Sequence, residues 1–195
     1  MIKSHSAIMD ELKAYASPRS KLTRLIKSGE LIQVRRGLFV DDRSTSLRSL
    51  APVVYGPSYI SFQSALAIWN LIPERVPVMI SASFNKNKDK AYHTPLGEFR
   101  YLYLPNTVYP YGIQLEKENG MGYLIASPEK ALCDMVYKTP SLLHTADIEA
   151  FLLEDLRMEL EELLKFDREF INFIAPRYRR KSLVALAQWF EQNGR

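Results

Sequence analysis

Cationic and hydroxyl-bearing side chains are concentrated between residues 17 and 37 of the chain. Arginine, lysine, serine and threonine side chains bind phosphate oxygens and the hydrogen-bonding edges of bases, which is the chemistry of duplex DNA recognition. Some of them fall on the polar faces of a predicted helix, and two directly precede a glycine in a predicted turn. The residues that we expect to contact DNA are Arg19, Ser20, Thr23, Arg24, Lys27, Arg35 and Arg36.

Two helices are predicted near the start of the chain, and the second of them carries five of these side chains. Residues 6–15 predict a first helix, with Ser6 as its N-cap. A second helix opens on Ser17-Pro18, because serine caps a helix and proline is tolerated at its first position. Gly29 ends this helix in the left-handed conformation that glycine adopts without strain. The apolar stripe of the second helix is Leu22, Leu25 and Ile26.

A tight hairpin is predicted directly after the second helix. Its strands are residues 31–34 and 38–40, and Gly37 permits a positive φ in the turn beside Arg35 and Arg36. A basic helix followed by a hairpin is typical of a winged helix-turn-helix, which places the helix in the major groove and the hairpin against the backbone. Only two clear helices precede this hairpin, so the usual first helix is either fused into residues 2–15 or reduced.

The charge of the chain is uneven along its length. The net charge is +4, yet residues 1–50 hold ten Lys/Arg and five Asp/Glu. The remaining 145 residues hold sixteen Lys/Arg and seventeen Asp/Glu. The positive excess therefore belongs to the predicted DNA-binding unit, where it would attract phosphate. A solvated lysine-rich surface would give the same count.

The composition is that of an ordinary globular protein, with 47% apolar and 25% charged residues among 195. No apolar run is long enough for a membrane span, and the first residues lack the apolar segment of a signal peptide. Cys133 is the single cysteine, which excludes an internal disulfide. We expect a cytoplasmic protein without membrane contact, in which Cys133 is a small core residue.

The rest of the chain predicts a small mixed sheet with covering helices and then a helical tail. Residues 41–49 predict a linker, and residues 85–90 a charged loop. Asn119-Gly120 predicts the turn of a hairpin. Predicted helices are 59–71, 127–137, 146–166, 170–174 and 182–192, and predicted strands are 76–84, 97–104, 113–115 and 122–126. The fold class is therefore α+β, with a winged helix-turn-helix at residues 1–45 and an α+β domain with a helical C-terminus at residues 46–195.

The pattern of potential catalytic residues does not support an enzyme. The three histidines, His5, His93 and His144, stand apart from other metal ligands, and the chain has neither a phosphate-binding P-loop nor a nucleophile elbow. Glu129, Lys130 and Asp134 share one predicted helix. A carboxylate near the positive end of the helix and a solvated lysine explain the first two without catalysis. We expect no catalytic residue, no metal and no cofactor.

Four motifs resemble, in order, those of the AbiEi-like abortive-infection antitoxins of bacterial type IV toxin–antitoxin systems. They are the segments 24–40, 58–66, 94–99 and 126–134. The resemblance extends from about residue 15 to residue 137, whereas the helical tail matches only in general character. Asn70 stands where many relatives carry glycine, and the chain is short for the family.

The resemblance implies a repressor that binds operator DNA and regulates its own operon. It also implies a C-terminal domain that counteracts a nucleotidyltransferase-like toxin, in general without a stable complex. Such repressors read inverted repeats as homodimers or as paired monomers, and nothing in the sequence distinguishes the two. Operator DNA and the toxin are thus the expected partners.

Two other functions are compatible with parts of the sequence. In a protein–protein interaction module, the basic helix and the acidic residues at 147–162 would bind a partner protein instead of DNA. In a nuclease, carboxylates on or near the predicted strands would hold a metal; the candidates are Glu98, Glu116 and Glu118. We favour the DNA-binding repressor and antitoxin.

Overall fold

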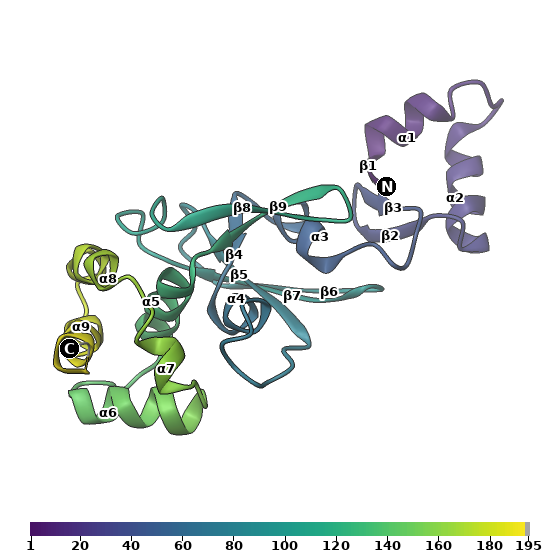
Figure 1. Cartoon of the computed structure of the whole chain (residues 1–195). Coiled ribbons are helices and arrows are strands. Elements are labelled where there is room, and N and C mark those ends of the chain that lie inside the picture. Colours follow the sequence, from purple (N-terminus) through teal and green to yellow (C-terminus); the bar gives the residue numbers. More distant parts are fainter. Residues whose placement is uncertain (194–195) are drawn as a thin grey trace.

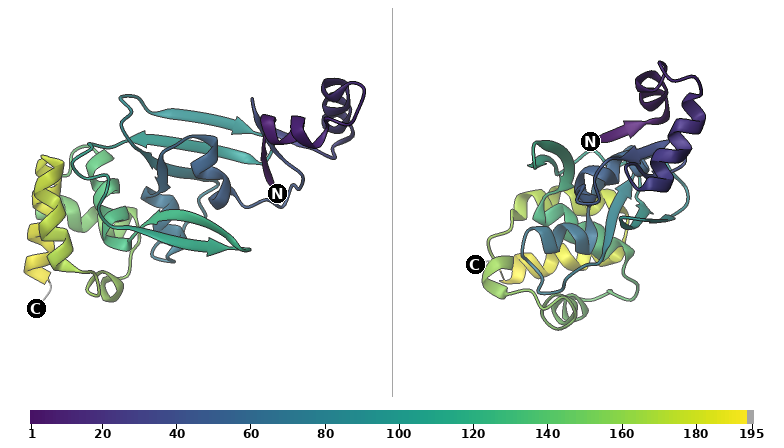
Figure 2. Two further views of the ribbon diagram at one scale, coloured as in Figure 1. Left: turned by 90° about the horizontal axis from the view of Figure 1, so that it is seen from above. Right: turned by 90° about the vertical axis from the view of Figure 1, so that its right-hand side faces the viewer.

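A computed structural model describes residues 1–193, and over this range the chain is an α+β fold with nine α-helices and a six-stranded mixed sheet. The molecule is elongated (Figure 1): a small N-terminal unit lies at one end, the large sheet in the middle and the C-terminal helices at the other end. Two further views show the same separation of the ends (Figure 2). Among the described residues, no helix is both long and apolar enough to cross a bilayer.

The N-terminal unit has two helices and a three-stranded antiparallel sheet in the order β1-β3-β2. Its elements are β1 (Ile2–Ser4), α1 (His5–Glu11), α2 (Pro18–Ser28), β2 (Ile32–Arg35) and β3 (Leu38–Val40). The prediction that Ser6 caps the first helix is wrong, because the Ser4 hydroxyl accepts from the Ala7 N–H at 3.2 Å. Pairing of β1 with β3 extends the chain up to Ser4, and the helix starts at the next residue.

The β2–β3 hairpin contributes to two hydrophobic cores. Leu31, just before β2, and Phe39 pack with Ile8, Leu12 and Leu22 of the two N-terminal helices. The opposite side of the hairpin joins the large core beside α3 (Leu47–Val54), and it does so through Ile32, Val34, Leu38 and Val40. The hairpin thus connects the N-terminal unit to the rest of the molecule. The division at residue 45 stays a prediction.

The large sheet has the strand order β6-β7-β5-β4-β9-β8, with parallel pairs β5–β7 and β4–β9 and antiparallel pairs elsewhere. Its strands are β4 (Ser58–Ile60), β5 (Val78–Ser83), β6 (Lys90–Thr94), β7 (Gly97–Tyr103), β8 (Ile113–Glu118) and β9 (Met121–Ala126). The predicted hairpin with an Asn119-Gly120 turn is present as β8–β9.

Several predicted boundaries around this sheet are wrong. The predicted helix 59–71 begins instead as strand β4, because Tyr59 and Ile60 pair with β5 and β9, and only α4 (Phe62–Ile68) is helical. The predicted charged loop 85–90 ends one residue too late, because Lys90 already pairs with Tyr101 at the start of β6. The predicted linker 41–49 already contains the start of α3, which Ser46 caps by accepting from the Arg48 N–H.

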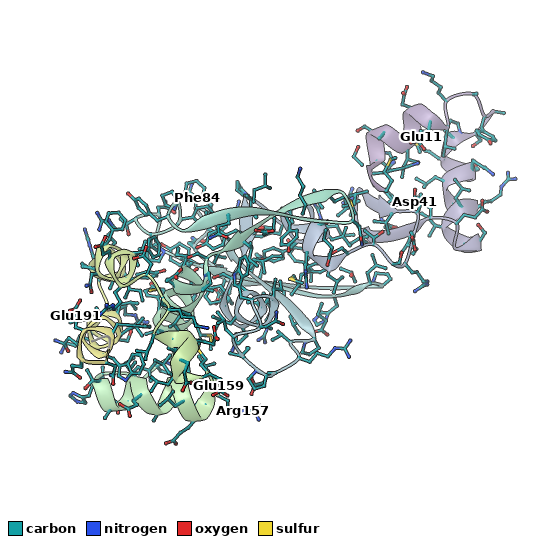
Figure 3. All side chains as sticks on the ribbon, in the orientation of Figure 1. Glu11, Asp41, Phe84, Arg157, Glu159 and Glu191 are labelled. Carbon is teal, nitrogen blue, oxygen red and sulfur yellow. The ribbon has the colours of Figure 1, made fainter. Side chains whose placement is uncertain are left out.

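The C-terminal helices pack at the end of the molecule that is distant from the N-terminal unit (Figure 1). They are α5 (Pro128–Lys138), α6 (Thr145–Ala150), a π-helical turn (Phe151–Asp155), α7 (Leu160–Leu163), α8 (Arg168–Ile174), a 3₁₀ turn (Ala175–Tyr178) and α9 (Lys181–Asn193). The prediction of one helix over 146–166 is wrong. The chain bends between Asp155 and Leu160, where Arg157 has a φ of 51° and forms an ion pair with Glu74. Figure 3 shows Arg157 and Glu159 at this bend.

Candidate nucleic-acid interface

The helix α2 presents all five of its predicted DNA-binding residues to solvent. Leu22 on its other side is buried and Leu25 and Ile26 pack against the same small core, so the helix is held by its apolar stripe. The N-terminal proline and Gly29, which has a φ of 78°, bound the helix as its sequence predicts. Two hydroxyls have local partners: Thr23 donates to the Arg19 carbonyl oxygen at 3.0 Å, and Ser20 accepts from Ser17 at 2.8 Å.

The two arginines of the hairpin turn differ in what they contact. The Arg35 guanidinium donates to the Val53 carbonyl oxygen at 3.2 Å and to that of Arg36 at 3.4 Å. Arg36 is exposed and has no ion pair or side-chain hydrogen bond within residues 1–193. The turn itself lies against the start of α1, where the His5 N–H donates to the Gly37 carbonyl oxygen at 3.0 Å. Arg36 is therefore the side chain that is free to reach a ligand.

Three acidic groups of the N-terminal unit have partners away from α2, whereas Glu30, just after this helix, accepts from the Ser28 hydroxyl at 2.6 Å. Asp10 pairs with Lys13 at 3.0 Å, and Glu11 of α1 pairs with Lys3 at 2.8 Å. Asp41, after β3, pairs with the N-terminal amine, which holds the pKa of its carboxyl below the usual range. Figure 3 shows Glu11 on α1 and Asp41 beside the hairpin. Among the described residues, the Arg19, Arg24 and Lys27 cations have no carboxylate partner.

A fully buried ionic cluster lies between the sheet and the C-terminal helices. Both oxygens of the Asp134 carboxylate are used: Oδ1 accepts from Lys130 and Tyr178, and Oδ2 accepts from Tyr59 at 3.0 Å and Ser61 at 2.7 Å. Lys130 Nζ also contacts the Tyr178 hydroxyl at 2.7 Å. The prediction of a solvated Lys130 is wrong, because this side chain is 0% exposed.

The cluster joins three parts of the fold that are distant in the sequence. Tyr59 lies on β4, and Ser61 follows this strand directly. Lys130 and Asp134 are one helical turn apart on α5, and Tyr178 is the last residue of the 3₁₀ turn. The Lys130 ammonium also lies over the rings of Tyr59 and Tyr178, 5.5 and 5.1 Å from their centres. Because every member is at most 2% exposed, a substrate has no access to it, and we interpret it as structural. Its only sequence signal is the i, i+4 spacing of Lys130 and Asp134.

The free energy of unfolding is expected to fall as the pH rises above about 10, where phenols of an unfolded chain ionise. Burial, and then the Asp134 charge, raises the pKa of both Tyr59 and Tyr178 well above its ordinary value. The folded protein therefore keeps these protons while the unfolded chain loses them. Below about pH 10 the contribution of these tyrosines to the free energy of unfolding is complete. Above that pH the free energy of unfolding decreases by up to about 1.4 kcal/mol per pH unit for each such tyrosine. Urea denaturation at a series of alkaline pH values measures this decrease.

Burial also raises the pKa of Tyr101 and Tyr109, so they add to the decrease. The Tyr59→Phe variant is the control for this pH dependence, because it lacks one of these phenolic protons and should show a shallower decrease. An ultraviolet titration in which all eleven tyrosines of the folded protein ionise near pH 10 would contradict the expectation.

The thiol of Cys133, next to this cluster on α5, is buried as predicted, and burial raises its pKa.

The carboxylates considered for a nuclease are not brought together. Glu98 lies on β7, which is separated from β8 with Glu116 and Glu118 by three other strands. Glu98 contacts His93 at 2.8 Å, and Glu118 contacts Arg48 at 3.1 Å. Residues 1–193 contain no group of three or more His, Cys, Asp or Glu side chains arranged to hold a metal ion.

A scan against models of protein families found no match, and a search of the curated proteins found no similar sequence. The exposed cations of the N-terminal unit are therefore the observation from which a function can be inferred.

Proposed function

We propose that this protein is a cytoplasmic DNA-binding repressor that contacts duplex DNA through the outer face of α2. The observation that carries the proposal is a set of exposed cations on this helix, Arg19, Arg24 and Lys27, together with two exposed hydroxyls. None of the three cations has a carboxylate partner within residues 1–193. A small core of its own holds the helix from the other side. A helix held in this way can enter the major groove without losing its packing.

The order of the N-terminal elements supports a winged helix-turn-helix. A strand, two helices and a hairpin follow one another, and the first strand pairs with the last, as β1 does with β3. In such a unit the second helix reads base edges and the hairpin contacts the backbone. Here α2 takes the first role, and Arg36 in the turn takes the second. Arg35 instead holds the turn to α3 through the Val53 carbonyl oxygen.

The contacts divide into those that select a sequence and those that add affinity. Arginine and lysine on α2 pair with guanine, and Ser20 and Thr23 with either base or phosphate. Each good contact to a base contributes about 1–3 kcal/mol of discrimination. The Arg36 contact to phosphate instead adds affinity that decreases with salt, independently of sequence.

The resemblance to AbiEi-like antitoxins supports an extension of the proposal. In that case the operator lies upstream of the protein's own gene, and residues 46–195 counteract a nucleotidyltransferase-like toxin encoded next to it. The antitoxin role is measured by the growth of cells that express the neighbouring gene, with and without this chain. Growth that this chain does not restore would contradict the antitoxin role and leave the repressor role standing.

DNA binding is tested by fluorescence anisotropy with the duplex upstream of the gene and a scrambled duplex, each at two salt concentrations. We expect selective, salt-sensitive binding that the Arg19→Gln/Arg24→Gln/Lys27→Gln variant loses. The Arg36→Gln variant should bind both duplexes more weakly, with a salt slope reduced by about one. The matched control is Arg179→Gln/Arg180→Gln/Lys181→Gln, which removes the same charge at the other end of the molecule and should bind DNA normally.

Two results would overturn this proposal. One is binding without preference for the upstream duplex, and the other is a triple α2 variant that binds as tightly as the native protein. Either result would favour the alternative in which the N-terminal unit binds another protein. Circular dichroism of each variant checks that its fold is intact, and it should be, because the substituted side chains are exposed.

A further inference from the structure

A cationic hollow lies at the C-terminal end of the molecule, where the loop after α5 meets the start of α9. Its volume is about 280 Å³, and its lining residues are Thr139, Pro140, Ser141, Leu142, Leu143, Arg179, Arg180, Lys181 and Ser182. Pockets for drug-sized ligands have volumes of about 300–1,000 Å³, so this hollow suits a smaller group. None of the nine lining residues is acidic.

Three consecutive cations line the hollow without charge partners. Arg179, Arg180 and Lys181 are exposed, and none forms an ion pair within the described part of the chain. Water and salt weaken the repulsion between these exposed charges, and a bound anion would turn the remaining repulsion into attraction. The Arg180 guanidinium lies over the Tyr137 ring, 5.2 Å from its centre, which restricts its position. An anion would therefore meet a partly preorganised group.

The neighbouring Arg177 has a structural role in the same segment, because its guanidinium packs against aromatic rings. Its guanidinium lies 3.7 Å from the centre of the Phe173 ring and 5.7 Å from that of Tyr111, and it donates to the Phe173 carbonyl oxygen. Arg177 does not line the hollow. Arg179, Arg180 and Lys181 make fewer such contacts. Packing therefore explains the position of Arg177, but it does not explain why the other three cations lie together.

Hydroxyl groups complete the lining of the hollow. The Ser141 hydroxyl makes no hydrogen bond within residues 1–193, and its residue is exposed. Ser182 is 7% exposed and its hydroxyl has one long contact, 3.4 Å from the Val136 carbonyl oxygen. The first residues of α9, a helix of 13 residues, add N–H groups and the positive end of the helix dipole. Charged forks, hydroxyls and amide donors together match the several oxygens of a phosphate group.

We propose that this hollow binds the phosphate group of a small phosphate monoester. Arginine forks and the lysine ammonium neutralise the dianion, and the hollow's size admits a phosphate with part of the sugar that carries it. The site is independent of the proposed DNA contact, because the two lie at opposite ends of the molecule (Figures 1 and 2). A duplex is too wide for this hollow, so its ligand is not the operator.

Isothermal titration calorimetry of the full-length protein with adenosine monophosphate tests the site, with adenosine and inorganic phosphate in parallel. We expect binding of the monophosphate, no binding of adenosine, and weaker binding of inorganic phosphate. The Arg179→Gln/Arg180→Gln/Lys181→Gln variant should lose binding, and each single substitution should weaken it about tenfold, as for the loss of one charge-assisted hydrogen bond. Equal binding of phosphate and monophosphate would restrict the ligand to the free anion.

The triple α2 variant is the matched control, with the same change of charge, and should bind the monophosphate normally. Failure of this site and failure of DNA binding are therefore separate results, since each triple variant is the control of the other. The proposal is overturned if neither phosphate compound binds, if adenosine binds as well as its monophosphate, or if the C-terminal triple variant binds like the native protein. Unchanged thermal unfolding of the variants would exclude loss of the fold as the reason for lost binding.

Discussion

Replacing Asp134 by alanine is expected to lower the free energy of unfolding by about 3–5 kcal/mol, the range for removing one partner of a buried ion pair. The substitution leaves the Lys130 ammonium without its carboxylate at a site that is 0% exposed. It also removes the acceptor of the Tyr59, Ser61 and Tyr178 hydroxyls. Urea denaturation followed by circular dichroism measures the change.

Two further variants separate the ion pair from the loss of a side chain as such. The Lys130→Met/Asp134→Leu variant should be less destabilised than Asp134→Ala, because it leaves no buried charge without a partner. The Glu129→Ala variant on the same helix is the control. Its carboxylate makes only a 3.2 Å contact to the Asp167 N–H, so a loss of about 1 kcal/mol is expected. An Asp134→Ala protein as stable as Glu129→Ala would contradict the structural role of the cluster.

The Gly112→Ala substitution is expected to cost about 2–5 kcal/mol, from a left-handed backbone and from overpacking. Gly112 has a φ of 65°, and an added Cβ would lie 2.6 Å from Phe170 Cζ and 2.8 Å from Lys130 Cβ. Lys130 cannot move freely, because its ammonium is fixed in the ionic cluster. The Gly112 carbonyl also accepts from the Ser127 N–H at 2.7 Å, which ties this loop to the start of α5.

The Gly120→Ala variant is matched to Gly112→Ala in backbone conformation. Gly120 has a φ of 79° in the β8–β9 turn, and an added Cβ would have no atom within 4 Å. It should therefore cost only the conformational strain, about 1–2 kcal/mol. The difference in the free energy of unfolding between the two variants, from chemical denaturation, measures the cost of the contact between the added Cβ and Phe170 and Lys130. Equal losses would mean that Phe170 and Lys130 move aside.

The elements that the sequence predicts correctly carry local signals. Serine and proline mark the starts of α2 and α5, and Gly29 marks the end of α2. The β8–β9 hairpin follows from its Asn-Gly turn. Each signal acts within a few residues and needs no distant partner, which is why pattern alone suffices.

The elements and residues that were predicted wrongly depend on distant partners. Tyr59 and Ile60 have a sequence compatible with helix and become a strand because β5 and β9 offer backbone partners on both sides. Lys130 looks like a solvated residue of an amphipathic helix, and it is buried by Tyr178, which is 48 residues away. Of the candidate DNA-binding residues, the pattern could not show that Arg35 is held by Val53.

The hairpin that contributes to two cores also determines how the N-terminal unit is oriented. A flexible linker would let α2 change its orientation relative to the rest of the protein. Here β2 and β3 pack against a hydrophobic core on each side, so the large sheet and α3 fix the orientation of α2. A fragment cut after the hairpin would expose an apolar sheet face in water. If two copies bind DNA side by side, as the proposed function allows, the size of the whole protein would set the distance between them and therefore the separation of the half-sites.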